Sequence, residues 1–387
     1  MKENIHNRHS ANLFDSLDVP AVLLSDPDSV RYGAGIELPF AGHFPEKPVG
    51  CLLTRDWNNL LICPYDWSRA AVDQGWEGRV AAYPDSHADP FSFIADTVGA
   101  HLGENGLETQ EAGIEEEYLP AALFGSLKNA CPKLKLTPVD GELGRLRRIK
   151  AESEVELLRT AAEQLEFGLI GAIQHLEGSL EENGYTLPEF CERIRVHVYE
   201  TGGTAGGLAA AASGDGSAVW YHLPRGKFIP GELVRVEASS RYFGYWACTS
   251  RMMSIGETTD LQKRVYAENL LLKQRALELL NPGVKASTIF TAVAEIAASE
   301  GIDFRGEFGI GGGIGTSETE SPSLDPSDGT PLEEGMCISL AVYTEGPRKE
   351  LVCVKDTYLI TADGPHCISS YHNWDGVYAV TGFRSAH

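Results

Sequence analysis

The stretch GELVRVEASSRYFGYWACTSRMMSIG, residues 231–256, decides the fold of this chain. Its apolar and aromatic runs predict a pair of β-strands. Glu237 interrupts the apolar run LVRVEA, where a buried carboxylate is costly unless it has a partner or a raised pKa. Arg251, on the second strand, is the partner that we expect for Glu237, either in a structural ion pair or in a clamp for a substrate.

The residues that follow predict two helices and then more strands. Helical periodicity covers 258–280 and 287–299, with Asn281-Pro282-Gly283 ending the first helix and Gly301 ending the second. GMCISLAVYTEG (335–346) and ELVCVKDTYLITADG (350–364) then predict strands.

The residues upstream predict a second, smaller domain. A long amphipathic stretch at 141–176 follows short apolar strands at 21–25, 50–54 and 59–64 and a helix at 89–102. These apolar strands lack polar alternation, which is typical of strands covered by helices on both faces. We therefore expect an α/β domain at 1–145 and a second domain at 146–387.

Composition and charge narrow the function. The 55 acidic and 32 basic residues give a formal charge of −23, which disfavours binding to nucleic acid or to anionic lipid. The eight cysteines include no CxxC pair, so neither a zinc ribbon nor a disulfide framework is predicted. The N-terminus lacks an apolar signal core, and no apolar run is long enough to span a bilayer. We expect a cytoplasmic protein.

The strand pair and its neighbours resemble the creatinase and aminopeptidase P family, also called peptidase family M24. LRRIKAESEVELLRTAA (146–162) resembles the helix that opens that family's catalytic domain, and 231–256 resembles its central strand pair. GMCISLAVY and VKDTYLITADG resemble its last two strands. The resemblance implies an α+β pita-bread fold preceded by a smaller α/β domain, and a homodimer.

The resemblance also implies five metal-ligand positions, which hold other residues here. In metal-dependent members two Asp, one His and two Glu bind two divalent cations. Glu237 and Cys248 stand at the two Asp positions, Gly312 at the His, and Ala341 and Lys355 at the two Glu. We therefore expect neither a dinuclear metal site nor another cofactor. Thr319 stands at a further family His, although Glu320 of the same motif is kept.

Within the family, creatinase is the precedent for catalysis without metal. The resemblance places His222, in AVWYHLPRG, at creatinase's acid/base histidine, although two fewer residues separate it from the strand. Ser250 and Ala341 replace acidic residues of creatinase, so creatine is not the expected substrate.

The candidate catalytic residues are His222, Glu237, Arg251 and Lys355. Lys355 could point into the cavity and supply positive charge in place of a metal, with its neighbour Asp356 facing solvent, or it could be an outward strand lysine; we favour the inward orientation. The candidate substrate-binding residues are Tyr221, Tyr245, Cys248, Glu320, Tyr343, Arg31 and Tyr32. Cys248 is either a nucleophile or a buried apolar side chain. By analogy with creatinase-like dimers, Arg31 and Tyr32 would reach the partner subunit's active site.

Three functions follow from this pattern. The first is a metal-independent hydrolase or lyase that acts on a C–N bond of a small polar substrate, with His222 as acid/base. The second is an Xaa-Pro aminopeptidase or dipeptidase-like metallopeptidase. The third is a non-catalytic relative that binds a ligand or a protein partner.

Overall fold

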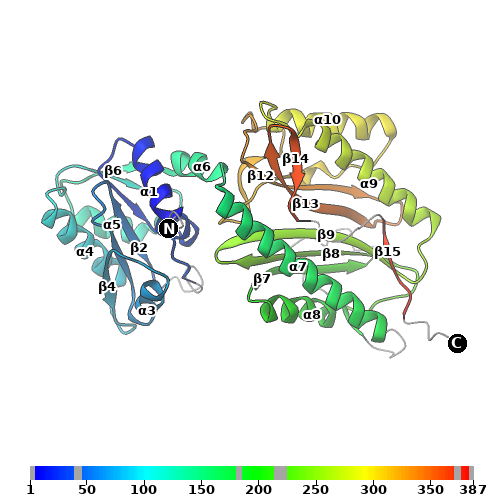
Figure 1. The fold of residues 1–387 in the computed structure, drawn as a ribbon, viewed down its shortest axis with the longest axis horizontal. Helices are drawn as coiled ribbons and strands as arrows, with labels where there is room; N and C mark the ends of the chain where they lie inside the picture. The colour runs from blue at the N-terminus through cyan, green and yellow to red at the C-terminus, as the bar shows by residue number, and fades with distance from the viewer. Residues whose placement is uncertain (1–4, 39–45, 180–184, 213–224, 370–375, 383–387) are drawn as a thin grey trace. The chain divides into compact units, whose positions relative to one another are not determined.

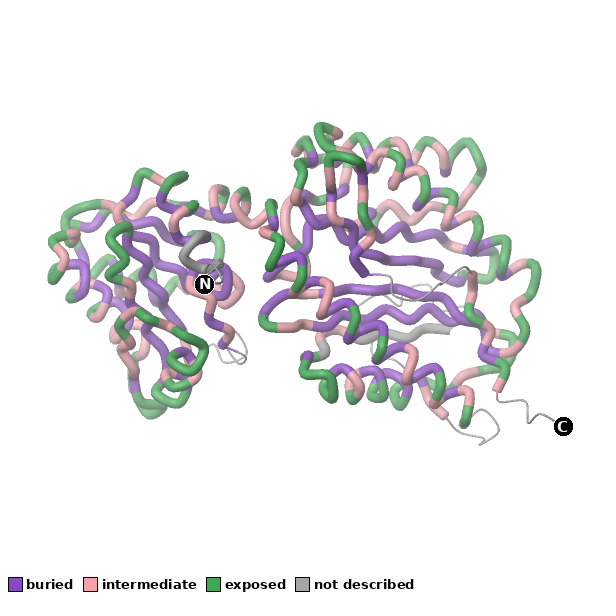
Figure 2. The backbone as a smooth tube through the Cα atoms, in the orientation of Figure 1, coloured by how far each residue is buried: buried purple, intermediate pink, exposed green. Residues whose placement is uncertain are grey.

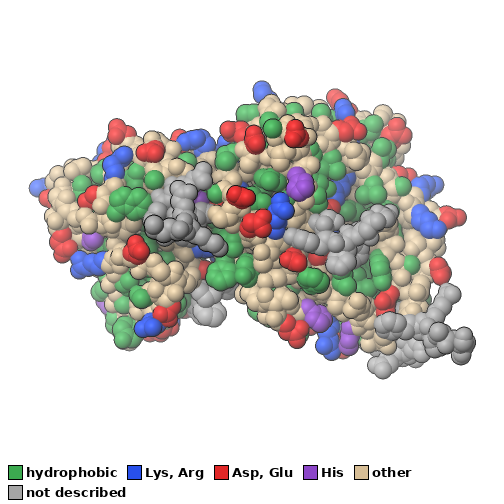
Figure 3. Space-filling model, viewed as in Figure 1, with side chains coloured by type: hydrophobic (Ala, Val, Ile, Leu, Met, Phe, Trp, Pro, Cys, Tyr) green, Lys and Arg blue, Asp and Glu red, His purple; other side chains and the backbone are tan. Residues whose placement is uncertain are grey.

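The computed structural model describes residues 5–38, 46–179, 185–212, 225–369 and 376–382. It divides the chain into two compact units, residues 1–147 and 148–387 (Figure 1). Each unit has its own sheet. None of the described helices is both long and apolar enough to cross a membrane. The face shown in Figure 3 carries acidic and basic side chains interspersed with each other.

The first unit is a mixed sheet covered by helices. Its strands lie in the order β4-β3-β2-β1-β5-β6, with β1 antiparallel to β2 and parallel to β5. Its elements are α1 (Ile5–Ser16), β1 (Ala21–Leu24), α2 (Pro27–Ala34), β2 (Gly50–Thr54), β3 (Leu60–Pro64), α3 (Tyr65–Asp73), β4 (Arg79–Tyr83), α4 (Pro90–Glu104), β5 (Glu111–Ile114), α5 (Ala121–Ala130), β6 (Lys135–Pro138) and α6 (Asp140–Arg148).

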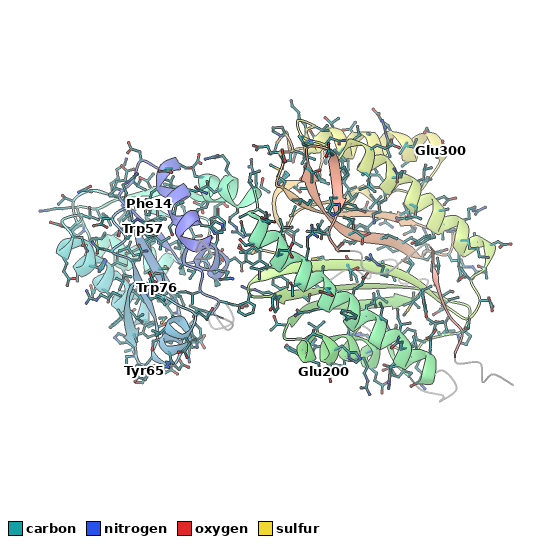
Figure 4. All side chains as sticks on the ribbon, in the orientation of Figure 1. Phe14, Trp57, Tyr65, Trp76, Glu200 and Glu300 are labelled. Atoms are coloured by element: carbon teal, nitrogen blue, oxygen red, sulfur yellow. The ribbon has the colours of Figure 1, made fainter. Side chains whose placement is uncertain are left out.

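The central strands of this unit are buried on both faces because side chains alternate along a strand. Val22 and Leu24 of β1 join one core, whereas Ala21 and Leu23 join a second core on the opposite face. Phe14, labelled in Figure 4, contributes to the first core from α1. Every residue of β1, β2 and β3 is buried, as Figure 2 shows, which agrees with the unbroken apolar runs in the sequence.

Glu115 is a buried carboxylic acid in this unit. It follows β5, and because β5 runs parallel to β1, it meets the residues that follow β1. The backbone N–H groups of Ser25 and Asp26 donate to Oε2 of Glu115 at 2.6 and 3.0 Å. Burial nevertheless raises the pKa of Glu115 to about 7.

We expect Glu115→Gln to stabilise the protein at about pH 8 and to change little at about pH 4.5. A carboxyl group whose pKa is raised by folding contributes stability that is complete below its unfolded pKa. That contribution is lost as the pH rises through its folded pKa, which is about 7 here. Glutamine keeps the oxygen acceptor without ionising, so the variant should gain about 2 kcal/mol at the higher pH. Urea unfolding at several pH values from about 4.5 to 8 measures the gain. If the free energy of unfolding changed with pH in the same way for both proteins, the prediction would be contradicted.

The second unit contains a larger sheet in the order β11-β10-β12-β13-β9-β8-β7, with β14 on β13 and β15 on β9. Its elements are α7 (Glu152–Ser179), α8 (Leu187–Glu200), β7 (Thr204–Ala212), β8 (Leu233–Tyr242), β9 (Tyr245–Ile255), α9 (Asp260–Leu279), α10 (Ala286–Glu300), the 3-10 helix η1 (Gly306–Phe308), β10 (Gly311–Gly313), β11 (Glu320–Ser323), β12 (Cys337–Glu345), β13 (Leu351–Thr361), β14 (Gly364–Cys367) and β15 (Tyr378–Val380).

The helices of this unit cover one face of the sheet, which we call the helix face. Helices α7 and α8 pack against β8 and β9 through Val234, Val236 and their neighbours. Helices α9 and α10 pack against β12 and β13 through Leu340, Val342 and their neighbours. Side chains at the alternate strand positions point to the opposite face, which we call the pocket face. Strand register therefore decides which residues can meet at a site.

The amphipathic stretch at 141–176 contains two helices. Helix α6 ends at Arg148 and α7 begins at Glu152. Between them Ile149 bridges to Met336, and the backbone N–H of Lys150 donates to the carbonyl of Gly335 at 2.9 Å. This pairing with a distant segment takes the backbone out of the helix, which local periodicity does not reveal.

Candidate active site

Four strands place a row of side chains on the pocket face. Glu237 on β8 lies opposite Ser250 on β9, and Ser250 lies opposite Lys355 on β13. Lys355 in turn lies opposite Ala341 on β12. Residues directly opposite each other share a face, so this row brings Glu237 and Lys355 together from positions 118 residues apart.

Glu237 is the centre of a buried charge cluster. Its side chain is 0% exposed, and Lys355 Nζ donates to its Oε1 at 2.7 Å. The hydroxyl of Tyr343 donates to the same oxygen at 2.5 Å, and Arg235 donates to Oε2. Arg235 reaches Glu237 because residues two apart on a strand share a face. Two cations thus share one carboxylate.

Glu237 and Lys355 each favour the charged form of the other. Burial disfavours the charged carboxylate, but Lys355 and Arg235 outweigh it and lower the pKa of Glu237. Burial also disfavours the ammonium of Lys355, yet Glu237 raises the pKa of that lysine. Tyr343 stays a neutral donor because burial raises its pKa well above the usual value.

A pocket of about 300 Å³ opens beside this cluster. Lys355, Cys248 and Glu318 line its polar part, and Phe308 and Tyr343 line its aromatic part. The two aromatic rings meet edge to face with centroids 5.3 Å apart. The pocket also has the backbone of Gly309 and Gly311–Gly313, Thr319, Ser323, Ser339 and Ala341 in its lining.

Cys248 and Glu318 form the second polar pair of the pocket. The thiol of Cys248 donates to Oε1 of Glu318 at 3.5 Å, a bond that sulfur's size allows. Burial, with a smaller effect of Glu318, raises the pKa of Cys248 well above its usual value. Burial also raises the pKa of Glu318, although Lys355 opposes the rise. The thiol is therefore protonated at neutral pH, which removes the thiolate that a nucleophile needs.

Arg251 does not lie where we expected it. It lies opposite Val236 on the helix face, whereas Glu237 lies on the pocket face. Its guanidinium donates to Asp356 at 2.6 Å and to Glu166 of α7 at 3.3 Å. The expected pairing with Glu237 is wrong because strand alternation sends neighbouring residues to opposite faces.

Asp356 also differs from the expectation that it would face solvent. It does point away from Lys355, but helices cover that face, and the residue is 7% exposed. Lys273 of α9 donates to its Oδ2 at 2.5 Å. Burial opposes the charge of Asp356, but Lys273 and Arg251 lower its pKa.

Two of the candidate substrate-binding residues have partners away from the residues that line the pocket. The hydroxyl of Tyr245 donates to Oε1 of Glu154 on α7 at 2.9 Å. Glu320 forms an ion pair with Lys150 at 2.7 Å, and both side chains are buried. Both residues therefore hold the opening helix segment of this unit to its sheet.

Of four other candidates, two lie in the first unit and two lie outside the described residues. Arg31 and Tyr32 are buried within the first unit, where Arg31 donates to the carbonyl of Gly35 and Tyr32 stacks on His9. Tyr221 and His222 lie outside the described residues. Their expected roles stay predictions.

Sequence reasoning missed Arg235 and Glu318. Arg235 carried a usable signal, because it stands two residues before Glu237 in the same strand and so shares its face. Glu318 stands in the glycine-rich segment GIGGGIGTSETESP, where no periodicity indicates a direction. Only the loop between β10 and β11 brings it to Cys248.

Glu237 and Cys248, at two of the family's ligand positions, already have other partners. Both carboxylate oxygens of Glu237 already accept from Lys355, Tyr343 and Arg235, and Cys248 is a protonated thiol. A Cβ at Gly312 would lie 2.7 Å from the carbonyl oxygen of Pro322, so any larger side chain at this position would require β10 or β11 to shift. Across the described part of the chain, no three His, Cys, Asp or Glu side chains converge as metal ligands.

The chain belongs to metallopeptidase family M24. The family's model matches residues 156–362, and a creatinase/prolidase N-terminal domain model matches residues 10–149. These matches confirm the resemblance drawn from 231–256. The second unit has the family's pita-bread fold, and the first has its smaller α/β domain.

The similar proteins include enzymes named for X-Pro substrates. An Xaa-Pro dipeptidase of Lactobacillus helveticus is 28% identical over 353 residues, which are 88% of this chain and 90% of that one. The X-Pro aminopeptidase structure from Thermotoga maritima has a TM-score of 0.78 at 20% identity and covers 94% of this chain and 99% of that one. The prolidase of Pyrococcus horikoshii has a TM-score of 0.76 at 22% identity and covers 96% and 99%.

Proposed function

We propose that this chain is a hydrolase that cleaves a C–N bond of a small, peptide-like substrate, with Lys355 supplying the positive charge that metal ions supply elsewhere in the family. The observation that carries the proposal is the ion pair between Lys355 Nζ and Glu237 at 2.7 Å, at two of the five family ligand positions. The pocket of about 300 Å³ suits a substrate of dipeptide size. The activity of the relatives supports the choice of bond.

Lys355 would stabilise the charge that develops on the substrate. When water adds to the acyl carbon, the carbonyl oxygen becomes an oxyanion. A fixed ammonium in a site that excludes water stabilises that oxyanion strongly. Glu237 and Tyr343 hold Lys355 in place, because Tyr343 and Lys355 donate to the same oxygen of Glu237.

Glu318 would carry the proton in this reaction. Its carboxylate would accept a proton from the attacking water as the new C–O bond forms, and would return it to the leaving nitrogen as the C–N bond breaks. The products are a carboxylic acid and an amine, so atoms and charge balance. A raised pKa suits an acid/base group. His222, which the family resemblance assigns to this chemistry, remains a second proton carrier in the proposal.

Cys248 would not be the nucleophile. Its thiol is protonated and donates to Glu318, so its role is to orient that carboxyl group. The proposal therefore treats Cys248 as a buried side chain with one hydrogen bond to Glu318.

We expect the purified protein to bind well under one metal ion per chain. The sample is tag-free protein dialysed against Mn²⁺ and Zn²⁺, with a metal-dependent prolidase treated in parallel as the positive control. Plasma mass spectrometry measures the metal, and the same sample is assayed on X-Pro dipeptides and on a panel of small amides and amidines with and without EDTA. Two metal ions per chain together with EDTA-sensitive cleavage would overturn the proposal.

A second candidate is an X-Pro dipeptidase that depends on metal, which the similarity to an Xaa-Pro dipeptidase favours. It requires ligands other than the five family positions. The dialysis experiment separates the two candidates, because only the second predicts stoichiometric metal and EDTA sensitivity. Absence of both metal and turnover would favour the third function, a non-catalytic binding protein.

We further propose a cytoplasmic homodimer in which Arg31 and Tyr32 approach the partner's pocket. This proposal rests on the family resemblance alone. Light scattering of the purified chain tests the dimer.

A further inference from the structure

The sheet of the second unit has few paired residues between β9 and β13, where Lys355 lines the pocket. β8 and β9 pair along nearly their whole length, as do β12 and β13. Between β9 and β13, which are both described in full, the register passes through one pair, Ser250 opposite Lys355. We call this junction the seam. Glu237 belongs to the half on one side of the seam and Lys355 to the other.

Arg251 bonds to the backbone of both strands at the seam. Its Nη1 donates to the carbonyl of Lys355 at 2.7 Å and to the carbonyl of Ser250 at 3.0 Å. The hydroxyl of Ser250 adds a bond across the seam to the carbonyl of Cys353 at 3.0 Å. A single guanidinium can make several such bonds because its donors form a rigid planar fork.

Charges from two helices hold this guanidinium in place. Asp356 of β13 accepts from Arg251 at 2.6 Å and from Lys273 of α9 at 2.5 Å. Glu166 of α7 accepts from Arg251 at 3.3 Å. Helix α7 packs on the half that contains β8 and β9, and α9 packs on the half that contains β12 and β13. The network therefore joins both halves and the helix on each.

We infer that Arg251 and Asp356 are positioning residues that clamp the two halves of the sheet together and thereby hold Lys355 against Glu237 on the opposite face. The inference concerns how the pocket is assembled, so it goes beyond the proposed hydrolase activity and does not depend on it. Arg251 bonds to the backbone carbonyl of Lys355 itself. A shift of β13 relative to β9 would therefore break this hydrogen bond and also move the Lys355 ammonium away from Glu237.

The test measures how often the pocket opens, using the thiol of Cys248 as the reporter. The variant is Arg251→Met in the full-length chain. The matched control is Lys150→Met, which breaks another buried ion pair of the same unit, Lys150 to Glu320 at 2.7 Å, away from the seam. Both variants are compared at urea concentrations that give them equal global stability. Iodoacetamide alkylation is timed, and peptide mass spectrometry assigns the label to Cys248.

At equal stability, we expect Cys248 in Arg251→Met to alkylate about 10-fold faster than in Lys150→Met, because only the first variant opens the seam locally. Hydrogen exchange of 245–255 and 351–361 should quicken in the same variant alone. Equal alkylation rates at matched stability would overturn the inference and leave the network as ordinary core structure.

A milder pair of variants keeps the test decisive if Arg251→Met does not fold. Arg251→Lys keeps the charge beside Asp356 but loses the planar fork that reaches two carbonyls, so it should also quicken alkylation of Cys248. Lys150→Arg is its control and should not. The readout needs no substrate, so a failed search for hydrolase activity leaves this result standing, and a failed clamp leaves the hydrolase proposal standing.

Discussion

Replacing Glu237 with glutamine is expected to lower the free energy of unfolding by about 3–5 kcal/mol, because it leaves buried cations without their counter-ion. Among the described side chains, Lys355 and Arg235 both donate to this carboxylate. Glutamine has nearly the same shape as glutamate, so the lost stability measures the effect of the missing charge and not of altered packing. Urea unfolding followed by circular dichroism measures the change.

Lys355→Met is the control for that loss and should cost much less, within about 1 kcal/mol. It leaves Arg235 and Glu237 as a one-to-one pair, whereas the wild-type cluster has two cations on one carboxylate. The double variant Glu237→Gln/Lys355→Met should recover part of the stability lost in Glu237→Gln. If Lys355→Met were as destabilising as Glu237→Gln, the account of the cluster as two cations sharing one anion would be wrong.

Lys355→Met is expected to lower turnover by about 100-fold or more while the protein stays folded. The ammonium is the group proposed to stabilise the oxyanion, and removal of one such donor typically lowers kcat by about 100-fold or more. The assay uses whichever X-Pro dipeptide or small amide the wild-type protein cleaves in the metal experiment. Unchanged kcat/KM in this variant would refute the role of Lys355.

The matched control for that experiment is Lys349→Met. Lys349 lies in the turn that leads into β13, and its side chain is 71% exposed, so the variant removes the same charge without touching the pocket. It should leave turnover unchanged. Loss of activity in both variants would indicate an effect of net charge rather than of the ammonium in the pocket.

The pH dependence of turnover should report Glu318 if it carries the proton. Its raised pKa predicts that activity falls as the pH drops through that pKa and the carboxylate is lost. Glu318→Gln should remove this acidic limb together with most of the activity. A full acidic limb in a residually active Glu318→Gln variant would assign the limb to another group.

The sequence by itself determined several of the strands and helices and the family. Apolar runs such as 21–25 and 50–54 predict strands buried on both faces, because no polar alternation interrupts them. The stretch 231–256 predicts a strand pair, and in the family's order with 146–162 and 335–364 it defines the fold. Local patterns suffice here because strand and helix formation depend on periodicity, which neighbouring residues carry.

Only the tertiary structure decided which charges meet. From the sequence of the strand pair alone, we expected Arg251 to pair with Glu237. The register of β8 and β9 instead places the two side chains on opposite faces of the sheet. Lys355 and Asp356 are neighbours in sequence, but one lines the pocket and the other forms ion pairs with Arg251 of β9 and Lys273 of α9 on the opposite face. Glu318 reaches Cys248 only through a loop. These contacts depend on register and on packing between distant segments, and a one-residue shift in register would exchange the two faces.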